Sequence, residues 1–395
     1  MNLPLAGVRV VEYAQYVAGP LCGVLLADLG ADVVKVEPPA GDGYRHVMPV
    51  APGVGRYFVP LNRGKRSVVV DLKGDEGRAT SGKLLATADI VLHNFPRQRA
   101  ERFGLGWESL HEAQPTLVVG RVTSFGTSGP LAESPAYDLV AQARAGLLMA
   151  HASRGDTVPV RAGGIPMADL TAGFLLATGV LAALVRARET GVGELVDVSL
   201  LAAALAVQLQ DLVWLDGEDD DTEPRPADRE RLATRADEIA SGVAMNPYYR
   251  CFEAVDGFVA VACLNLAQRL AFLSLFDLED ATVEAPDVVP GDPVVRAEKE
   301  RVTESVVSAL RQETVATWLG RFADAGVPCG PVLQRESVHA DPQVAAECLV
   351  GEIDQPGLGA VRLLAPFVRV GGVARDAEAA PTLGADTASV LEELA

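Results

Sequence analysis

The side chain best placed to do chemistry is that of Asp169, in the stretch GGIPMADLTAG that spans residues 163–173. The residues after it are small and apolar, which predicts a buried helix beginning close to Asp169. The dipole of such a helix favours a carboxylate in its first turn. Local sequence therefore leaves two roles open for Asp169, a helix cap and a reactive carboxylate.

Two further segments lie where α/β proteins commonly bind ligands. The first is QYVAGP at residues 15–20, between a predicted strand and a predicted helix, where phosphates often bind. It lacks the GxGxxG pattern of dinucleotide-binding turns, so an ordinary strand-to-helix turn is the alternative. The second is the pair Tyr137 and Asp138 before another predicted helix, where Asp138 can equally be a helix cap.

A basic cluster follows the end of a third predicted strand. Arg97, Arg99 and Arg102 come shortly after Asn94 and Phe95. Arginine binds phosphate through paired hydrogen bonds, which makes the cluster a candidate phosphate site. A solvent-exposed helix face would give the same pattern, so both interpretations stay open.

The motifs of several enzyme classes are absent from the sequence. There is no GxSxG, HExxH or P-loop pattern, and the five histidines are scattered. The five cysteines show neither CxxC spacing nor histidines at zinc-ligand spacing. We therefore predict no metal site, and reduced thiols in a cytoplasmic protein. The first residues, MNLPLAGVRVVEY, also lack the plan of a signal peptide.

The formal net charge of −19 argues against binding to nucleic acid or to an anionic membrane surface. An anionic ligand would need local donors, such as backbone N–H groups at helix starts and a few arginines. The longest uncharged run, residues 170–185, is shorter than the ~18–20 residues of a membrane-spanning helix. We interpret it as a buried helix of a globular core.

Strand-like and helix-like segments alternate along the first half of the chain, which predicts a mostly parallel sheet covered by helices. The charged run at 217–239 interrupts the pattern and predicts a linker or mobile surface segment. A second unit follows, with a strand at 258–263 and helices at 266–276, 294–310 and 315–325. Strands of the first unit are predicted at 8–11, 32–36, 67–72, 89–92, 117–122 and 195–198.

Taken together, these segments resemble the class III coenzyme A-transferases, also called the CaiB/BaiF family. The resemblance covers nearly the whole chain. Its blocks occur in the same order as in the family. Among them are GVRVVEYAQYVAGP, LLADLGADVVKVEPP, LNRGKRSVVVDLK, SFGTSGP, AYDLVAQARAG, NPYYRCF and AGVPCGPV.

The resemblance implies an α/β fold with a Rossmann-like large domain and a smaller α/β domain. The large domain would comprise 1–215 with 332–395, the linker 216–243 and the small domain 244–331. Two chains would interlock as rings in a homodimer. The substrates would be an acyl-CoA and a small carboxylic acid, with no prosthetic group.

The resemblance also implies a site in which Asp169 is the catalytic nucleophile. Prolines stand at Pro38 and Pro135, where some relatives have basic coenzyme contacts, so the phosphates would depend on Arg97 or Arg102. The residues expected to bind the coenzyme are Gln15, Val17, Ala18, Val70, Asp71, Leu72, Lys73, Asn94, Phe95, Arg97, Arg102, Ala136, Tyr137 and Asp138.

Two other functions fit the same fold. The α-methylacyl-CoA racemases use a His before the equivalent of Asp138, whereas this chain has Tyr137 there. A phenol with an ordinary pKa near 10 is a poor base at neutral pH, so the racemase interpretation ranks second. A coenzyme-binding relative without turnover is the third. No glycine-rich loop of the kind seen in formyl-CoA transferases precedes Asn246, which argues against formyl or oxalyl substrates.

Overall fold

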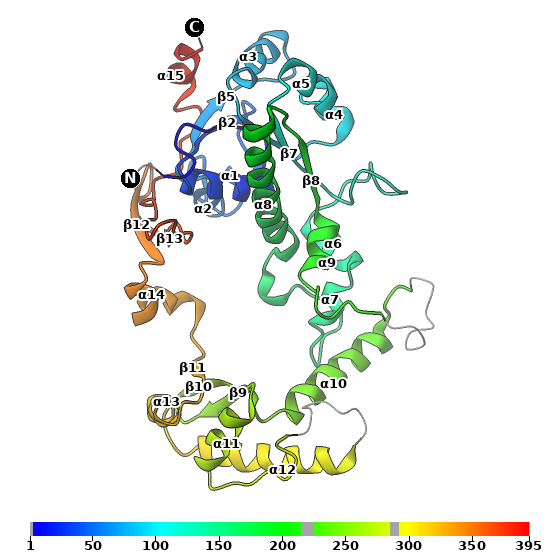
Figure 1. Ribbon diagram of the computed structural model, residues 1–395, viewed down its shortest axis with the longest axis vertical. Helices are drawn as coiled ribbons and strands as arrows, with labels where there is room; N and C mark the ends of the chain where they lie inside the picture. The colour runs from blue at the N-terminus through cyan, green and yellow to red at the C-terminus, as the bar shows by residue number, and fades with distance from the viewer. Residues whose placement is uncertain (1–2, 215–224, 285–291, 395) are drawn as a thin grey trace. The chain divides into compact units, whose positions relative to one another are not determined.

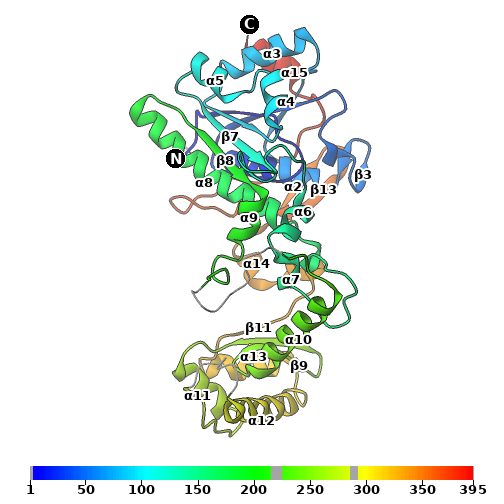
Figure 2. The ribbon, with the colours of Figure 1, turned by 90° about the vertical axis from the view of Figure 1, so that its right-hand side faces the viewer.

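The computed structural model describes residues 3–214, 225–284 and 292–394 of the 395-residue chain. These residues form two compact units (Figures 1 and 2). The larger unit contains residues 3–148, 161–214 and 342–394, and the smaller contains 149–160, 225–284 and 292–341. The division differs from the predicted boundaries at 149–160 and 332–341, which lie in the smaller unit.

The larger unit is built on a six-stranded sheet in the order β5-β2-β1-β6-β7-β8, with every neighbouring pair parallel. The chain fills one side of β1 first and then crosses to the other side at β6. Ligands of open α/β sheets bind in the crevice where the strand order reverses in this way. The strands are β1 (Arg9–Glu12), β2 (Asp32–Glu37), β5 (Arg66–Val69), β6 (Ile90–His93), β7 (Val118–Thr123) and β8 (Leu195–Ser199).

Helices cover both faces of this sheet, which confirms the α/β prediction. Adjacent valines on β1 face opposite layers, because Val10 packs with α1 and α8 whereas Val11 packs with α3 and α5. The first layer contains α1 (Ala18–Asp28), α6 (Asp138–Arg144), α8 (Met167–Thr190) and α9 (Leu200–Ala206). The second contains α3 (Asp75–Leu85), α4 (Arg97–Arg102), α5 (Trp107–Ala113) and α15 (Thr387–Glu392).

Helix α8 is the central helix of the first layer. It is 24 residues long and apolar enough, by length and composition, to cross a membrane. In this fold it instead packs on β7, β8 and α1, with Ala172, Leu176 and Val180 buried. A Cβ at Gly173 would lie 2.8 Å from the Ala18 carbonyl oxygen, so this glycine lets α1 and α8 approach closely.

Short elements complete the larger unit. They are β3 (Pro49–Ala51), β4 (Val54–Gly55), α2 (Phe58–Asn62), α7 (Leu147–Ala150), which reaches into the smaller unit, α14 (Pro342–Ala346), β12 (Val350–Gln355), β13 (Gly359–Leu364) and the 3-10 helices η1 (Gly43–Arg45) and η2 (Ala162–Gly164).

The smaller unit has an antiparallel sheet in the order β11-β10-β9, packed on helices around aromatic side chains such as Phe252, Phe272 and Trp318. The predicted strand and three helices are confirmed, with ends shifted by a few residues. The elements are β9 (Tyr249–Ala254), β10 (Gly257–Ala262), α11 (Leu266–Ser274), α12 (Pro293–Leu310), α13 (Val315–Asp324), β11 (Cys329–Pro331) and the 3-10 helix η3 (Arg335–Ala340).

The predicted linker at 216–243 needs correction, because α10 (Arg229–Met245) occupies its second half. Its residues up to 224 lie outside the described ranges. The Asp228 side chain caps α10 by accepting from the Arg231 N–H. Leu232 and Ala236, one turn apart, bury their side chains against Ala152. The charged residues from Arg229 to Glu238 therefore lie on the solvent face of an amphipathic helix.

Candidate active site

A cavity of about 480 Å³ opens at the carboxyl ends of β1, β6 and β7 in the larger unit. This is the edge at which parallel sheets with reversed strand order bind their ligands. We call it the cleft. Predicted site residues in its lining are Gln15, Val17, Ala18, Asn94, Phe95, Arg97, Ala136, Tyr137 and Asp169.

Six predicted residues are not in the cleft lining. Asp71 and Lys73 are exposed in the turn after β5, two strands away from β1 in the sheet. Val70 and Leu72 pack in the second layer. Arg102 lies at the end of α4, over the ring of Phe103. A contact between these residues and the coenzyme stays a prediction, whereas Asp138 acts on the cleft indirectly.

Asp169 sits in the first turn of α8 but does not cap it. The N-cap residue is Pro166, which offers no side-chain acceptor. The cap comes from Asp138, a 4% exposed residue of α6. Its Oδ1 accepts from the backbone N–H of Ala168 at 3.0 Å and of Asp169 at 3.3 Å. Asp138 therefore does the work of a cap, on α8 rather than on its own helix, and the Asp169 carboxylate is left available.

The second oxygen of Asp138 is also fully used. Oδ2 accepts from Gln142 Nε2 at 2.8 Å and from Arg161 NH1 at 3.1 Å. Gln142 is buried and donates to the Ile165 carbonyl as well. The segment before α8 is thus tied to α6 by polar contacts. These contacts fix the first turn of α8 and, with it, the position of Asp169.

The environment of Asp169 keeps its carboxyl group partly protonated near neutral pH. Burial is the main cause that raises its pKa to about 7, and the charge of Asp138 raises it further. The nearby Arg161 guanidinium opposes this rise. A carboxyl group with a pKa matched to neutral pH, in a cleft, is typical of a functional site.

The turn after β1 forms a second part of the cleft wall. Asn94 Oδ1 accepts from the Gln15 N–H at 3.2 Å, and Asn94 Nδ2 donates to the Gln15 carbonyl at 2.8 Å. Asn94 therefore fixes the turn as well as lining the cleft. Helix α1 begins at Ala18 after Val17, which provides no side-chain cap. The positive end of the α1 dipole thus lies at the wall formed by Val17 and Ala18.

Sequence reasoning predicted Tyr137 and the segment that contains Tyr16, both in the cleft lining with Asp169, but it missed Tyr44, Tyr57 and the grouping of these rings. The ring centroids of Tyr16 and Tyr44 are 5.5 Å apart, those of Tyr16 and Tyr137 5.8 Å, and those of Tyr44 and Tyr57 5.9 Å. Burial, followed by the charge of Asp169, raises the pKa of Tyr44 to about 12. Tyr16 adjoins a predicted residue, but no spacing in the sequence brings all of these rings together.

The outer part of the cleft is more polar. Arg97 and Arg99 are exposed on its rim, and Arg97 pairs with Glu101 at 2.9 Å. Deeper in the cleft, Arg121 forms two hydrogen bonds of 2.6 Å to Asp197 of the neighbouring strand. The arginines at the rim give this acidic protein local donors for an anionic ligand.

Comparison with known proteins decides the family. CoA-transferase family III matches residues 5–387 of the chain. The chain belongs to CoA-transferase family III.

Relatives and solved structures agree with this assignment. The chain is 32% identical to the succinate–glutarate CoA-transferase of Agrobacterium fabrum, over 99% of this chain and 96% of that protein. It is 30% identical to the human succinyl-CoA:glutarate CoA-transferase, over 99% of this chain and 86% of that protein. A CaiB/BaiF family protein from Brucella suis superposes with a TM-score of 0.79 at 30% identity, covering 100% of both chains.

Family III membership, together with relatives that are named CoA-transferases, confirms the predicted transfer of coenzyme A. The protein is a CoA-transferase, an enzyme that moves coenzyme A from an acyl-CoA to a carboxylic acid. The cleft suits such substrates in a CoA-transferase. It combines a half-buried carboxyl group at Asp169, a helix start at Val17 and Ala18, and arginines on its outer rim.

Proposed function

We propose that Asp169 carries the transfer covalently. An oxygen of its carboxylate attacks the thioester carbonyl carbon of the donor, the C–S bond breaks, and coenzyme A leaves as a thiolate. The thiolate then attacks the Asp169 side-chain carbonyl carbon of the mixed anhydride. The donor acid departs as a carboxylate, and an aspartyl–CoA thioester remains.

The acceptor acid then runs the same steps in reverse. Its carboxylate attacks the aspartyl carbonyl carbon, coenzyme A leaves again as a thiolate, and a new mixed anhydride forms. The thiolate attacks the acceptor's carbonyl carbon, which releases the new acyl-CoA and restores the Asp169 carboxylate. The sequence consumes no water, oxidant or metal, but it needs a site from which water is excluded, because water would hydrolyse the anhydride.

One observation carries this proposal. Asp138, not Asp169, caps α8, so the half-buried Asp169 carboxylate lines the cleft and forms no side-chain hydrogen bond or ion pair with the described residues. The start of α1, which lines the same cleft, offers backbone N–H groups for the oxyanion that develops in each step. A pKa near 7 leaves a useful fraction of Asp169 ionised at neutral pH.

We also propose that the exchanged acids are short dicarboxylic acids. The two relatives described above are named for succinate and glutarate, which are both of this class. The cavity of about 480 Å³ is modest in size, and Tyr16 and Tyr137, whose ring centroids are 5.8 Å apart, line it together with Asp169. A short polar acid fits such a lining better than a long acyl chain does.

The finer features of fold and assembly are proposals of the same kind. The strand order β5-β2-β1-β6-β7-β8 supports a Rossmann-like larger domain. Exposed apolar side chains on α8 and just beyond α9, among them Phe174, Val185 and Leu209, support burial against a second chain. We propose the interlocked homodimer, which light scattering would test. The five cysteines, all unpaired, support a reducing cytoplasmic location.

Mass spectrometry tests the covalent step directly. After incubation with succinyl-CoA and digestion, the peptide that contains Asp169 should carry coenzyme A or the acyl group. Asp169→Ala should lose this adduct and all measurable transfer while still binding coenzyme A. Asp211→Ala, at an exposed acid outside the cleft lining, is the matched control. Substantial turnover in the Asp169→Ala variant would refute the nucleophile.

A further inference from the structure

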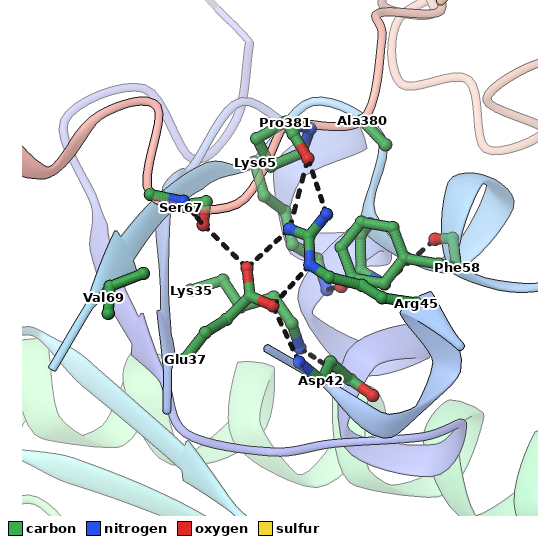
Figure 3. A network of polar contacts seen from close by, with 12 residues as sticks. Lys35, Glu37, Asp42, Arg45, Phe58, Lys65, Ser67, Val69, Ala380 and Pro381 are labelled. Carbon is green, nitrogen blue, oxygen red and sulfur yellow. Dashed lines mark hydrogen bonds and ion pairs between the residues drawn. The ribbon is translucent and has the colours of Figure 1, made fainter. Parts of the chain in front are cut away.

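A network of buried charges lies beside the cleft wall (Figure 3). It contains three acidic and three basic side chains, each at most 5% exposed, and every one has a partner of opposite charge. Pairing of this completeness is what makes the burial of charge tolerable. The members are Glu12, Lys35, Glu37, Asp42, Arg45 and Lys65.

Asp42 is the member that connects this network to the cleft. Its Oδ2 pairs with Lys35 Nζ at 2.9 Å, and its backbone N–H donates to Glu37 Oε2 at 2.9 Å. Its other oxygen, Oδ1, accepts from the backbone N–H of Tyr44 at 2.9 Å and of Tyr16 at 3.3 Å. One buried carboxylate therefore holds the backbones of two tyrosines from different elements.

The conformation of Tyr16 shows that its place is imposed by its surroundings. Its φ of 71° lies in the left-handed region, which residues other than glycine seldom adopt. A Cβ on Gly43 would lie 2.8 Å from Tyr16 Cε1 and 2.9 Å from its hydroxyl oxygen. Asp42 thus fixes the Tyr16 backbone, and Gly43 leaves the room that its ring needs.

Tyr44 adds a neutral hydroxyl next to the cleft, because its ring centroid lies 5.5 Å from that of Tyr16, which lines the cleft together with Asp169. The charge of Asp169 is, after burial, the largest cause of its raised pKa of about 12, so the phenol keeps its proton at any pH the enzyme meets. Burial and the neighbouring Tyr137 raise the pKa of Tyr16 as well. Within the described part of the chain, the Tyr44 hydroxyl has no hydrogen-bond partner and is free to donate to a ligand.

We propose that Tyr16 and Tyr44, positioned by Asp42, select the acid that exchanges coenzyme A by donating hydrogen bonds to its second carboxylate. The inference rests on the proposed function, in which one carboxylate of the acid reacts at Asp169. A short dicarboxylate would place its second carboxylate among the tyrosine hydroxyls.

Neutral donors suit this task better than cations. A lysine or arginine at the same place would pair with Asp169 and hold its carboxylate away from the thioester. A phenol can bind the distant carboxylate of the substrate without pairing with the nucleophile. An acid with a methyl group in place of the second carboxylate would leave the hydroxyls without that bond, and sites built on polar contacts reject such analogues.

The test compares two acceptor acids of equal length. With one acyl-CoA donor, kcat/KM is measured for glutarate and for valerate in the wild type, Tyr16→Phe and Tyr44→Phe. We expect the wild type to prefer glutarate, and each variant to lower the glutarate-to-valerate ratio about 10-fold, the size of one hydrogen bond to a charged group. Tyr13→Phe is the matched control, since its hydroxyl bonds to Ser81 in the second layer.

A second variant tests positioning without removing a hydroxyl. Gly43→Ala should push the Tyr16 ring aside and lower the same ratio, although every tyrosine remains. Equal losses for both acids in Tyr16→Phe and Tyr44→Phe, or a wild type that prefers valerate, would overturn the proposal. If the variants still form the Asp169 adduct but their glutarate-to-valerate ratio is unchanged, only this inference is overturned. If no adduct forms, the result counts against Asp169 as the nucleophile.

Discussion

Asp138 accepts a hydrogen bond from the backbone N–H of Asp169, with 3.3 Å between the nitrogen and Oδ1. The acid that caps the start of α8 and the acid that lines the cleft are therefore different residues from different helices. The same contact brings two carboxyl groups close enough for the charge of Asp138 to raise the pKa of Asp169. Arg161, which donates to Asp138, limits that rise.

The first prediction concerns this pair and the pH dependence of turnover. Only ionised Asp169 can attack, so kcat/KM should rise with pH through about 7, the pKa of that group. Asp138→Asn keeps an acceptor oxygen for the start of α8 but removes the charge that raises the pKa. The rising limb of its pH profile should therefore move to lower pH.

Asp138→Ala separates the cap from the charge. It removes the acceptor as well, and loss of an N-cap costs about 1 kcal/mol of stability. Urea unfolding should thus distinguish the alanine variant from the asparagine variant, although both lose the charge. A pH profile that does not move in Asp138→Asn would show that Asp138 leaves the pKa of Asp169 unaffected.

The second prediction concerns stability. The pKa of Asp169 is raised from 3.8 to about 7 in the folded protein, so between these values the folded state holds a proton that the unfolded chain has lost. The contribution of Asp169 to stability therefore falls as pH rises through this window and is constant above it. Asp169→Asn cannot ionise and should escape this loss.

The free energy of unfolding of Asp169→Asn, measured relative to wild type, should increase by on the order of 3 kcal/mol from pH 4 to pH 8. Urea unfolding of both proteins at the two pH values measures the gain, and groups common to both cancel. Asp211→Asn, at an exposed acid, should show the same difference from wild type at both pH values. No gain for Asp169→Asn at pH 8 would mean that Asp169 is not buried in its charged form.

The parts of the site that sequence predicted are those set by neighbours along the chain. Runs such as Val33–Val34 gave the buried strands, and Gln15, Asn94 and Asp169 follow or begin elements whose ends must meet at one sheet edge. The capping role of Asp138 was out of reach, because it acts on a helix 31 residues away in sequence. Only the packing of α6 on α8 reveals it.

Tyr44, Tyr57 and the buried charges were missed for the same reason. Glu12 and Lys35 are charged residues, which are rarely fully buried unless paired, and their pairing across β1 and β2 could not be foreseen from the sequence pattern alone. The charge density at 217–239 predicts a linker, whereas the charged residues from Arg229 to Glu238 lie on the exposed face of α10. Charge alone does not distinguish a linker from an amphipathic helix; the apolar spacing does.

The third prediction tests whether the buried network acts as a unit. Lys65 donates to both carboxylate oxygens of Glu12, at 3.0 and 2.8 Å. Lys65→Met leaves Glu12 with Lys35 as its ionic partner, and breaking a buried pair costs about 3–5 kcal/mol. Glu12→Gln should cost a similar amount. The double variant should cost less than the sum of the two, because it leaves no unpaired charge from this pair. Additive losses in urea unfolding would contradict a shared network.

The fourth prediction addresses how the coenzyme's phosphates are held. Arg97 lines the cleft, whereas Arg102 does not and lies over the ring of Phe103. Arg97→Ala should raise the KM for acyl-CoA about 10-fold, as expected for one exposed arginine–phosphate contact. Arg102→Ala should change it by less than about 2-fold. The opposite order of the two KM changes in steady-state kinetics would mean that the coenzyme binds near Arg102 and the predicted residues Val70 to Lys73 instead.

Glu101 provides a variant with the opposite sign. It lines the cleft and holds Arg97 in an ion pair at 2.9 Å, so it competes with a phosphate for the guanidinium and repels it. Glu101→Gln should therefore lower the KM for acyl-CoA a few-fold, and in the Arg97→Ala background this gain should shrink, since only the repulsion remains to be removed. If Glu101→Gln raises the KM instead, the ion pair positions Arg97 for the coenzyme rather than competing with it.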